Sequence, residues 1–66
     1  MRIRVNGEQH ELPDGLNAAA LLEIMGLAGQ RVAVEVNQEI VPRSTYPVHR
    51  LNEGDRVEIV RAIGGG

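Results

Sequence analysis

The sequence has no cysteine, no lysine, no tryptophan and no phenylalanine, and Tyr46 is its only tyrosine. Without cysteine the chain cannot form a disulfide or a zinc–thiolate site, and it has no thiol nucleophile. Without lysine it has no amine for Schiff-base chemistry and no P-loop lysine. One aromatic ring is too few to stack the bases of single-stranded nucleic acid.

Charge and hydropathy narrow the function classes further. The formal net charge is -2, so the chain has no overall attraction to phosphate. The longest apolar runs are a few residues, whereas a membrane-spanning helix needs about 20. Residues 1–4 lack the apolar core of a signal peptide. We therefore expect a cytoplasmic protein that binds neither nucleic acid nor a membrane.

The chain has 66 residues, which is enough for one domain and too few for two. At this size, folding buries only about 60% of the surface that the unfolded chain exposes. Little room is left for a deep catalytic cleft. The hydrophobic fraction of 42% and the charged fraction of 24% are ordinary for a globular domain, which argues against disorder.

Residues 1–12 have the pattern of a β-hairpin. Apolar residues alternate with arginines in residues 1–5, which predicts a strand with one buried face. Asn6-Gly7 is a strong signal for a two-residue type I′ turn, because both residues tolerate a positive φ. The return strand, residues 8–12, is more polar and is expected at or near a sheet edge.

A short helix is predicted after this hairpin. Asn17 is a suitable N-cap, and Leu16 before it can pack on the helix as a hydrophobic staple. One helix face carries apolar residues at spacings of three and four, namely Ala18, Leu21, Leu22 and Met25. Gly26 can adopt the left-handed conformation that ends a helix, with Leu27 folding back onto the last turn. So short a helix needs a sheet to pack on.

The second half of the chain predicts further strands. Residues 31–37 place three valines on one face, and residues 39–41 can pair back as a short strand. The prolines within residues 42–50 predict a loop. In the last strand, Val57 and Ile59 alternate with charged residues and are expected to face the helix.

The predicted order is strand, strand, helix, strand, short strand, strand, which defines an α+β domain. If the last strand pairs parallel with the first, a mixed sheet of four to five strands packs on one main helix. This is the β-grasp, or ubiquitin-like, arrangement. We expect residues 1–63 to form this single domain and residues 64–66 to form a flexible C-terminal tail.

The polar residues show no catalytic or metal-binding pattern. His10 and His49 have no third ligand at a recognisable spacing, so both are expected to be surface residues. Glu53 and Asp55 flank a glycine, an arrangement that a turn explains without acid–base catalysis. We therefore expect no enzyme active site and no metal site in the chain.

Three glycines, Gly64, Gly65 and Gly66, end the sequence. They bury no side chain and lose the most backbone entropy on ordering, so they cannot stabilise the fold. They could be an accident of the terminus or a cloning scar. Alternatively, they reach about 10 Å beyond the last strand and pass through a narrow channel into the active site of a partner. The partner could then activate the terminal carboxylate as an acyl-adenylate, from which sulfur displaces AMP.

Several segments together resemble the ThiS family of sulfur carriers in thiamine biosynthesis, within the wider MoaD and ThiS group. The matching segments are Asn6-Gly7-Glu8, residues 32–37, residues 40–43, residues 51–60 and Ala62-Ile63-Gly64-Gly65-Gly66. They cover essentially the whole chain. The resemblance implies a β-grasp fold and adenylation of the C-terminal glycine by an E1-like, ThiF-type enzyme. It also implies conversion to a thiocarboxylate and sulfur delivery to a ThiG-type thiazole synthase.

Carried over by position, the resemblance implies that Gly66 is adenylated and then bears the sulfur. Gly65 completes the diglycine, and Gly64 and Ile63 are expected to contribute to recognition of the tail. The activating partner would use ATP and Mg, whereas the chain itself would bind no cofactor. The chain would thus be a protein cosubstrate rather than an enzyme, and a sulfur-donor enzyme would be a third partner.

The end of the last strand is a candidate partner surface. Val60 and Ala62 have the opposite parity from Val57 and Ile59, so they are expected to point away from the helix. Exposed apolar groups beside the tail, with Arg61 at the rim, suit a protein–protein contact. Ordinary surface residues would look the same in the sequence.

Other functions remain open at this point. A MoaD-like carrier for molybdopterin synthesis would share the fold and the tail chemistry, although MoaD-type chains are typically longer and differ before the diglycine. A ubiquitin-like modifier would instead form isopeptide bonds with target lysines. A simple binding module with an idle tail would keep its full activity without Gly66.

Overall fold

The structure is a computed structural model and describes residues 1–61. The expected domain end at residue 63 and the glycine tail lie outside the described residues. The elements are, in chain order, β1 (Arg2–Val5), β2 (Glu8–Glu11), α1 (Ala18–Ile24), β3 (Val32–Val36), β4 (Glu39–Val41), the 3₁₀ helix η1 (Arg43–Val48) and β5 (Arg56–Arg61).

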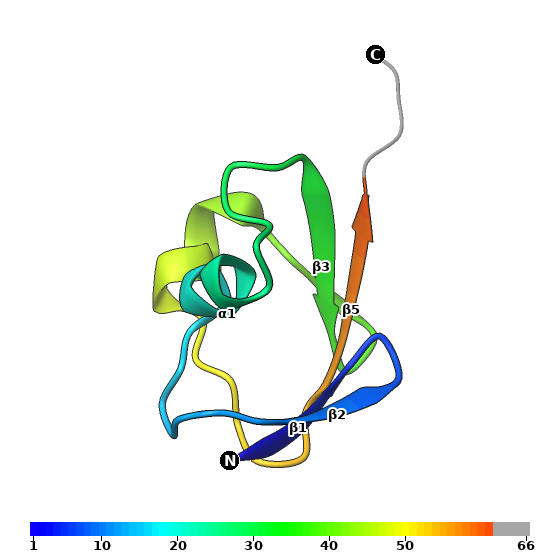
Figure 1. Cartoon of the computed structure of the whole chain (residues 1–66). Helices are drawn as coiled ribbons and strands as arrows, with labels where there is room; N and C mark the ends of the chain where they lie inside the picture. The colour runs from blue at the N-terminus through cyan, green and yellow to red at the C-terminus, as the bar shows by residue number, and fades with distance from the viewer. Residues whose placement is uncertain (62–66) are drawn as a thin grey trace.

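The strands of the described chain form one five-stranded sheet in the order β2-β1-β5-β3-β4. The central pair, β1 and β5, is parallel, and the other neighbouring pairs are antiparallel. Both α1 and η1 lie on the same side of the sheet (Figure 1). A mixed sheet that curves around one main helix is the β-grasp fold, so the predicted fold class is confirmed.

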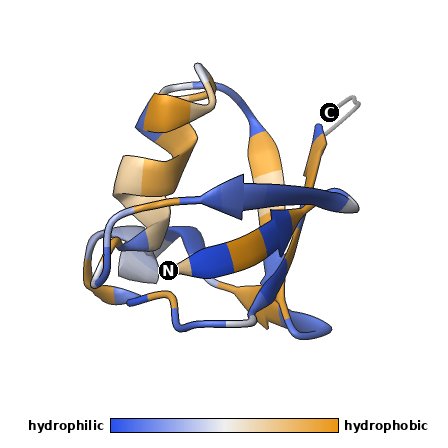
Figure 2. Ribbon diagram, turned by 60° about the horizontal axis from the view of Figure 1, so that its bottom comes forward, coloured by the Kyte–Doolittle hydropathy of each residue, from blue (hydrophilic) through white to orange (hydrophobic). Residues whose placement is uncertain are grey.

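The core lies between the sheet and α1. Hydrophobic and hydrophilic residues alternate along β1, whereas β2 is hydrophilic throughout (Figure 2). Val57 and Ile59 are buried, as predicted, and Met25 packs against the core from a half-buried position. The buried side chains are Ile3, Val5, Ala18, Leu21, Leu22, Val34, Val36, Val41, Tyr46, Leu51, Val57 and Ile59.

Two tight turns set the strand registers. Asn6 and Gly7 have φ angles of 50° and 83°, which confirms the predicted type I′ geometry. The second hairpin joins β3 to β4 through Asn37 and Gln38. These residues have φ angles of 52° and 71°, so φ is positive at both positions, as it is in the first turn. Gln38 adopts this conformation although it has a Cβ atom, which makes it a strained position.

The ends of α1 are closed as the sequence predicts. The Asn17 side chain accepts a hydrogen bond from the Ala20 backbone N–H at 2.8 Å. At the other end, Gly26 has a φ of 74° and the Leu27 N–H donates to the Leu22 carbonyl at 2.8 Å. These two features define a Schellman motif.

The prediction of a loop over residues 42–50 was wrong, because η1 occupies Arg43–Val48. The Thr45 side chain donates to the Pro42 carbonyl at 2.8 Å, which closes the first turn. Tyr46 is buried and its hydroxyl lies 3.4 Å from the Val32 carbonyl oxygen. The ring of Tyr46 thus anchors a segment whose prolines would otherwise favour an irregular loop.

Candidate functional site at the end of β5

Strand β5 leads directly to the glycine tail, and its last described residues form the candidate site. Val60 is 57% exposed and Arg61 is exposed, so both lie on the surface as predicted. The parity argument for Val60 is confirmed, because Val57 and Ile59 are buried on the opposite face. Ala62 lies outside the described residues, as do Ile63, Gly64, Gly65 and Gly66.

The position of β5 is fixed from both sides. On one side it pairs with β3 over residues 57–61, from Val36 opposite Val57 to Val32 opposite Arg61. On the other side the parallel pairing with β1 is short and ends at Val5 opposite Val57. Pairing with β3 therefore holds β5 up to Arg61, the last residue that the structure describes.

Asn6 extends the contact between β5 and the β1 side of the sheet. Its backbone N–H donates to the Val57 carbonyl at 2.9 Å. Its side-chain Oδ1 accepts from the Ile59 N–H at 2.7 Å, and its Nδ2 donates to the Ile59 carbonyl at 3.2 Å. β1 ends at Val5, so the Asn6 carboxamide supplies the two hydrogen bonds that a neighbouring strand would otherwise make to Ile59.

Beyond Ile59, β5 has less support. In the described part of the chain, Val60 and Arg61 pair with β3 and have no strand partner on the β1 side. The backbone groups of Val57 and Ile59 point toward the β1 side, so the alternation along β5 turns those of Val60 toward β3 and those of Arg61 toward the open side. Within residues 1–61 the backbone N–H and C=O of Arg61 have no strand partner there and can pair with a partner protein. This open edge lies directly before the tail.

Sequence reasoning missed the second role of Asn6, which it assigned only to a turn. The contact with Ile59 joins residues 53 positions apart, so no local pattern could reveal it. The only signal was the choice of asparagine rather than glycine or aspartate at a position that all of these can occupy.

The polar residues elsewhere have structural roles, as expected from the sequence. Asp55 is buried and accepts hydrogen bonds from the Asn37 Nδ2 at 2.9 Å and the Asn52 N–H at 2.8 Å. Glu53 accepts a hydrogen bond from the Arg2 N–H at 2.9 Å. Both carboxylates therefore fix the turn before β5.

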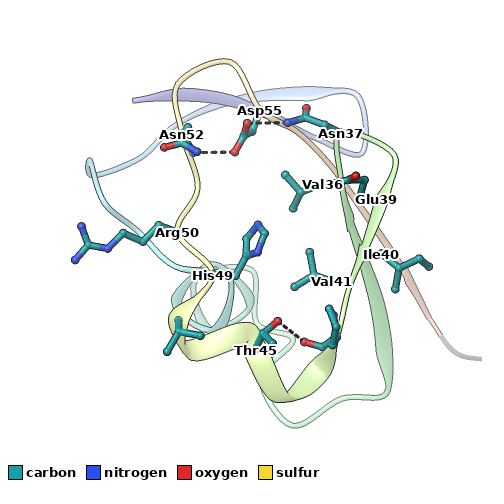
Figure 3. Close-up of a pocket in the computed structure, with 12 residues that line it drawn as sticks. Val36, Asn37, Glu39, Ile40, Val41, Thr45, His49, Arg50, Asn52 and Asp55 are labelled. Atoms are coloured by element: carbon teal, nitrogen blue, oxygen red, sulfur yellow. Dashed lines mark hydrogen bonds between the residues drawn. The ribbon is translucent and has the colours of Figure 1, made fainter.

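The two histidines lie apart. Both are half-buried, although the sequence predicted surface residues. The Nε2 atom of His10 is buried, lies 3.9 Å from the Glu8 Oε1 and has no hydrogen-bond partner within residues 1–61. His49 points into a surface hollow of about 530 Å³ between β4 and the turn before β5 (Figure 3). Within residues 1–61, no three His, Asp or Glu side chains are placed to hold a metal ion.

The helices of the described chain are too short or too polar to cross a membrane. The architecture, with a parallel central strand pair and one grasped helix, defines a ubiquitin-like β-grasp protein. The terminal strand carries the candidate site.

A family model described as the ThiS family matches residues 3–66, and the chain belongs to this family. The match to the family model includes residues 62–66, which the structure does not describe.

Two relatives of similar length support this assignment. The chain is 30% identical to the sulfur carrier protein ThiS of Escherichia coli over the full length of both proteins. It resembles the crystal structure of the thiamine biosynthesis protein ThiS from Geobacter metallireducens with a TM-score of 0.87 and 32% identity, over 100% of both chains.

A third relative is much longer. The chain is 44% identical over all its 66 residues to a thiazole synthase of Paramagnetospirillum magneticum. It spans only 20% of the length of that protein, and the same share of a thiazole synthase of Magnetococcus marinus.

Proposed function

We propose that this chain carries sulfur for thiazole formation in thiamine biosynthesis as a thiocarboxylate on Gly66. The observation that carries the proposal is the full-length similarity to the sulfur carrier protein ThiS of Escherichia coli, in a chain that ends with three glycines. The fold supports it, because pairing with β3 holds the middle strand β5 in place up to Arg61, the last described residue before the tail segment.

The proposed chemistry takes place at one carboxyl group. An oxygen of the Gly66 carboxylate attacks the α-phosphorus of ATP, pyrophosphate leaves, and an acyl-adenylate forms. Hydrosulfide, released by a sulfur-donor enzyme, then attacks the acyl carbon, and the bond from that carbon to the AMP oxygen breaks. The product is a thiocarboxylate, and one oxygen of the original carboxylate leaves with AMP.

The domain itself contributes position rather than reactivity. Gly64 and Gly65 have no Cβ atoms, so they fit a narrow channel that would exclude larger residues. Ile63 would mark the point at which the channel mouth must widen. Val60, Arg61 and Ala62 would contact the rim of the partner.

The proposed partners follow from this chemistry. An E1-like, ThiF-type enzyme would bind ATP and Mg and adenylate the tail, and a sulfur-donor enzyme would supply the sulfur. A ThiG-type thiazole synthase would receive it, and the two thiazole synthases that contain a segment similar to this whole chain support that partner. We place the reaction in the cytoplasm, and we propose that the chain binds no cofactor of its own.

Intact mass spectrometry tests the proposal. The chain is incubated with a ThiF-type enzyme, Mg-ATP and sulfide, and its mass should rise by the difference between sulfur and oxygen. A variant that lacks Gly66 should not react, because its carboxylate is displaced by about 3.3–3.6 Å and activation requires close alignment. A variant with one residue appended after Gly66 should also fail. Gain of sulfur by either variant would contradict the proposal.

The products of this incubation also distinguish a ThiS-type carrier from a protein modifier and from a MoaD-like carrier. Conjugates of higher mass with lysine-containing proteins would identify a protein modifier. A loaded carrier that supports molybdopterin formation but not thiazole formation would identify a MoaD-like carrier. Similarity to ThiS proteins in both sequence and structure favours the thiazole route.

A further inference from the structure

The outer face of the sheet, which points away from α1, brings two carboxylates together. In the antiparallel pair of β3 and β5, Glu35 lies directly opposite Glu58. Glu58 is exposed and Glu35 is half-buried, and neither forms an ion pair within residues 1–61. Like charges directly opposite each other on neighbouring strands are destabilising, so this arrangement lowers the stability of the isolated domain.

Apolar side chains border this acidic pair on the same face. Ile40 lies opposite Glu35 on β4 and is 67% exposed. Ala33 lies opposite Val60, and both are exposed. We call these five residues the acidic–apolar patch, which consists of Ala33, Glu35, Ile40, Glu58 and Val60.

The charge on the same face changes sign toward the start of β5. Arg4 lies beside Arg56 in the parallel pair, and both arginines are exposed. The face therefore runs from a cationic pair through the acidic pair to the apolar pair that precedes the tail. A partner surface with the complementary order would be oriented along β5 by charge alone.

We propose that the acidic–apolar patch docks thiazole synthase, through an arginine or lysine of that enzyme that lies between Glu35 and Glu58. This inference rests on the proposed function, which makes thiazole synthase the receiver of the tail. A guanidinium or ammonium group there would remove the repulsion between the two carboxylates and would hydrogen-bond to both. The apolar border would exclude water from the contact and strengthen the attraction.

The position of the patch supports this occupant. Val60 belongs to the patch and also begins the segment that leads to Gly66, so a partner seated on the patch can take the tail in the same contact. The patch holds two of the large hydrophobic side chains that are exposed in the described chain, Ile40 and Val60. Continuity with the proposed tail site limits the occupant to a protein that takes up the tail, and the two thiazole synthases that contain a segment similar to this chain favour thiazole synthase over the adenylating enzyme.

Calorimetric binding of the full chain to a ThiG-type thiazole synthase tests the inference without any sulfur loading. The double variant E35Q/E58Q should bind at least about tenfold more weakly than the unmodified chain, with a smaller dependence on salt. The same variant should melt at a higher temperature, because it no longer holds two like charges opposite each other. Glu58→Arg should bind more weakly still, since it places a cation against the cation of the enzyme.

Glu23→Gln is the matched control, because Glu23 is exposed on α1 and loses the same charge away from the patch. Its affinity should stay within about twofold of that of the unmodified chain. Equal weakening by Glu23→Gln, unchanged affinity of E35Q/E58Q, or no binding by the unmodified chain would each overturn the inference. Self-association of the chain that these substitutions abolish would also overturn it, in favour of a second copy as occupant. Sulfur loading of Gly66 is measured with a different enzyme, so the two proposals can fail separately.

Discussion

The carboxamide of Asn6 holds both backbone hydrogen-bonding groups of Ile59, at 2.7 Å from Oδ1 to the N–H nitrogen and 3.2 Å from Nδ2 to the carbonyl oxygen. Asn6 also begins the type I′ turn between β1 and β2, with a φ of 50°. Asn6 therefore reverses the chain direction between β1 and β2, and it also hydrogen-bonds to β5, the strand that leads to the tail.

Removal of this carboxamide should loosen the end of β5. Asn6→Gly keeps the positive φ but leaves the backbone groups of the buried Ile59 without their partners, so we expect a loss of about 1–3 kcal/mol of stability. Hydrogen exchange of the Ile59 amide should become faster in this variant. Unchanged protection of that amide would show that the carboxamide does not support β5.

The second hairpin offers a stabilising substitution. Gln38 has a φ of 71°, a conformation that is unfavourable for a residue with a Cβ atom. We expect Gln38→Gly to raise the free energy of unfolding by about 0.5–1 kcal/mol, because relief of this strain exceeds the entropy that glycine loses. Urea denaturation measures the change, and Gln38→Ala is the control that should bring no comparable gain. A lower urea midpoint for Gln38→Gly would contradict the turn geometry.

The packing of β5 against α1 can be tested at one buried and one exposed valine. Val57 is 1% exposed, and Val57→Ala should cost about 1–3 kcal/mol through lost burial and a cavity. Val60→Ala removes the same atoms from an exposed position and should change stability by no more than about 0.5 kcal/mol. Equal urea midpoints for the two variants would refute the assignment of the two faces.

The N-terminus predicts a dependence on alkaline pH. The Met1 amine lies 2.9 Å from the Asp14 carboxylate, and this hydrogen bond raises the pKa of the amine above its ordinary value of 8.0. The contribution to stability is therefore complete below the pKa of the unfolded chain and is lost as the pH rises through the higher pKa of the folded chain. Asp14→Asn should reduce the loss of stability at alkaline pH. Urea denaturation at a series of pH values above 8.0 measures the free energy of unfolding of both proteins. Parallel pH profiles for the two proteins would contradict it.

Local features of the fold could be predicted from the sequence. The turn at Asn6-Gly7, the N-cap at Asn17 and the closure at Gly26 each depend on residues a few positions apart. The alternation in β5 was also sufficient to separate the buried Val57 and Ile59 from the exposed Val60.

Long-range features could not be predicted in the same way. The 3₁₀ helix η1 depends on space in the core for Tyr46, which only the assembled sheet and α1 define. The contact between Asn6 and Ile59 and the opposition of Glu35 to Glu58 both follow from strand registers. The role proposed for Gly66 came from resemblance to a family, because a glycine tail alone does not specify a reaction.

The most direct test of the central claim is fragmentation of the intact chain after reaction with a ThiF-type enzyme, Mg-ATP and sulfide. The account predicts that the mass increase, equal to the difference between sulfur and oxygen, is found only in fragments that contain Gly66. Sulfur on any other residue, or a chain of unchanged mass in the presence of active enzyme, would contradict the account.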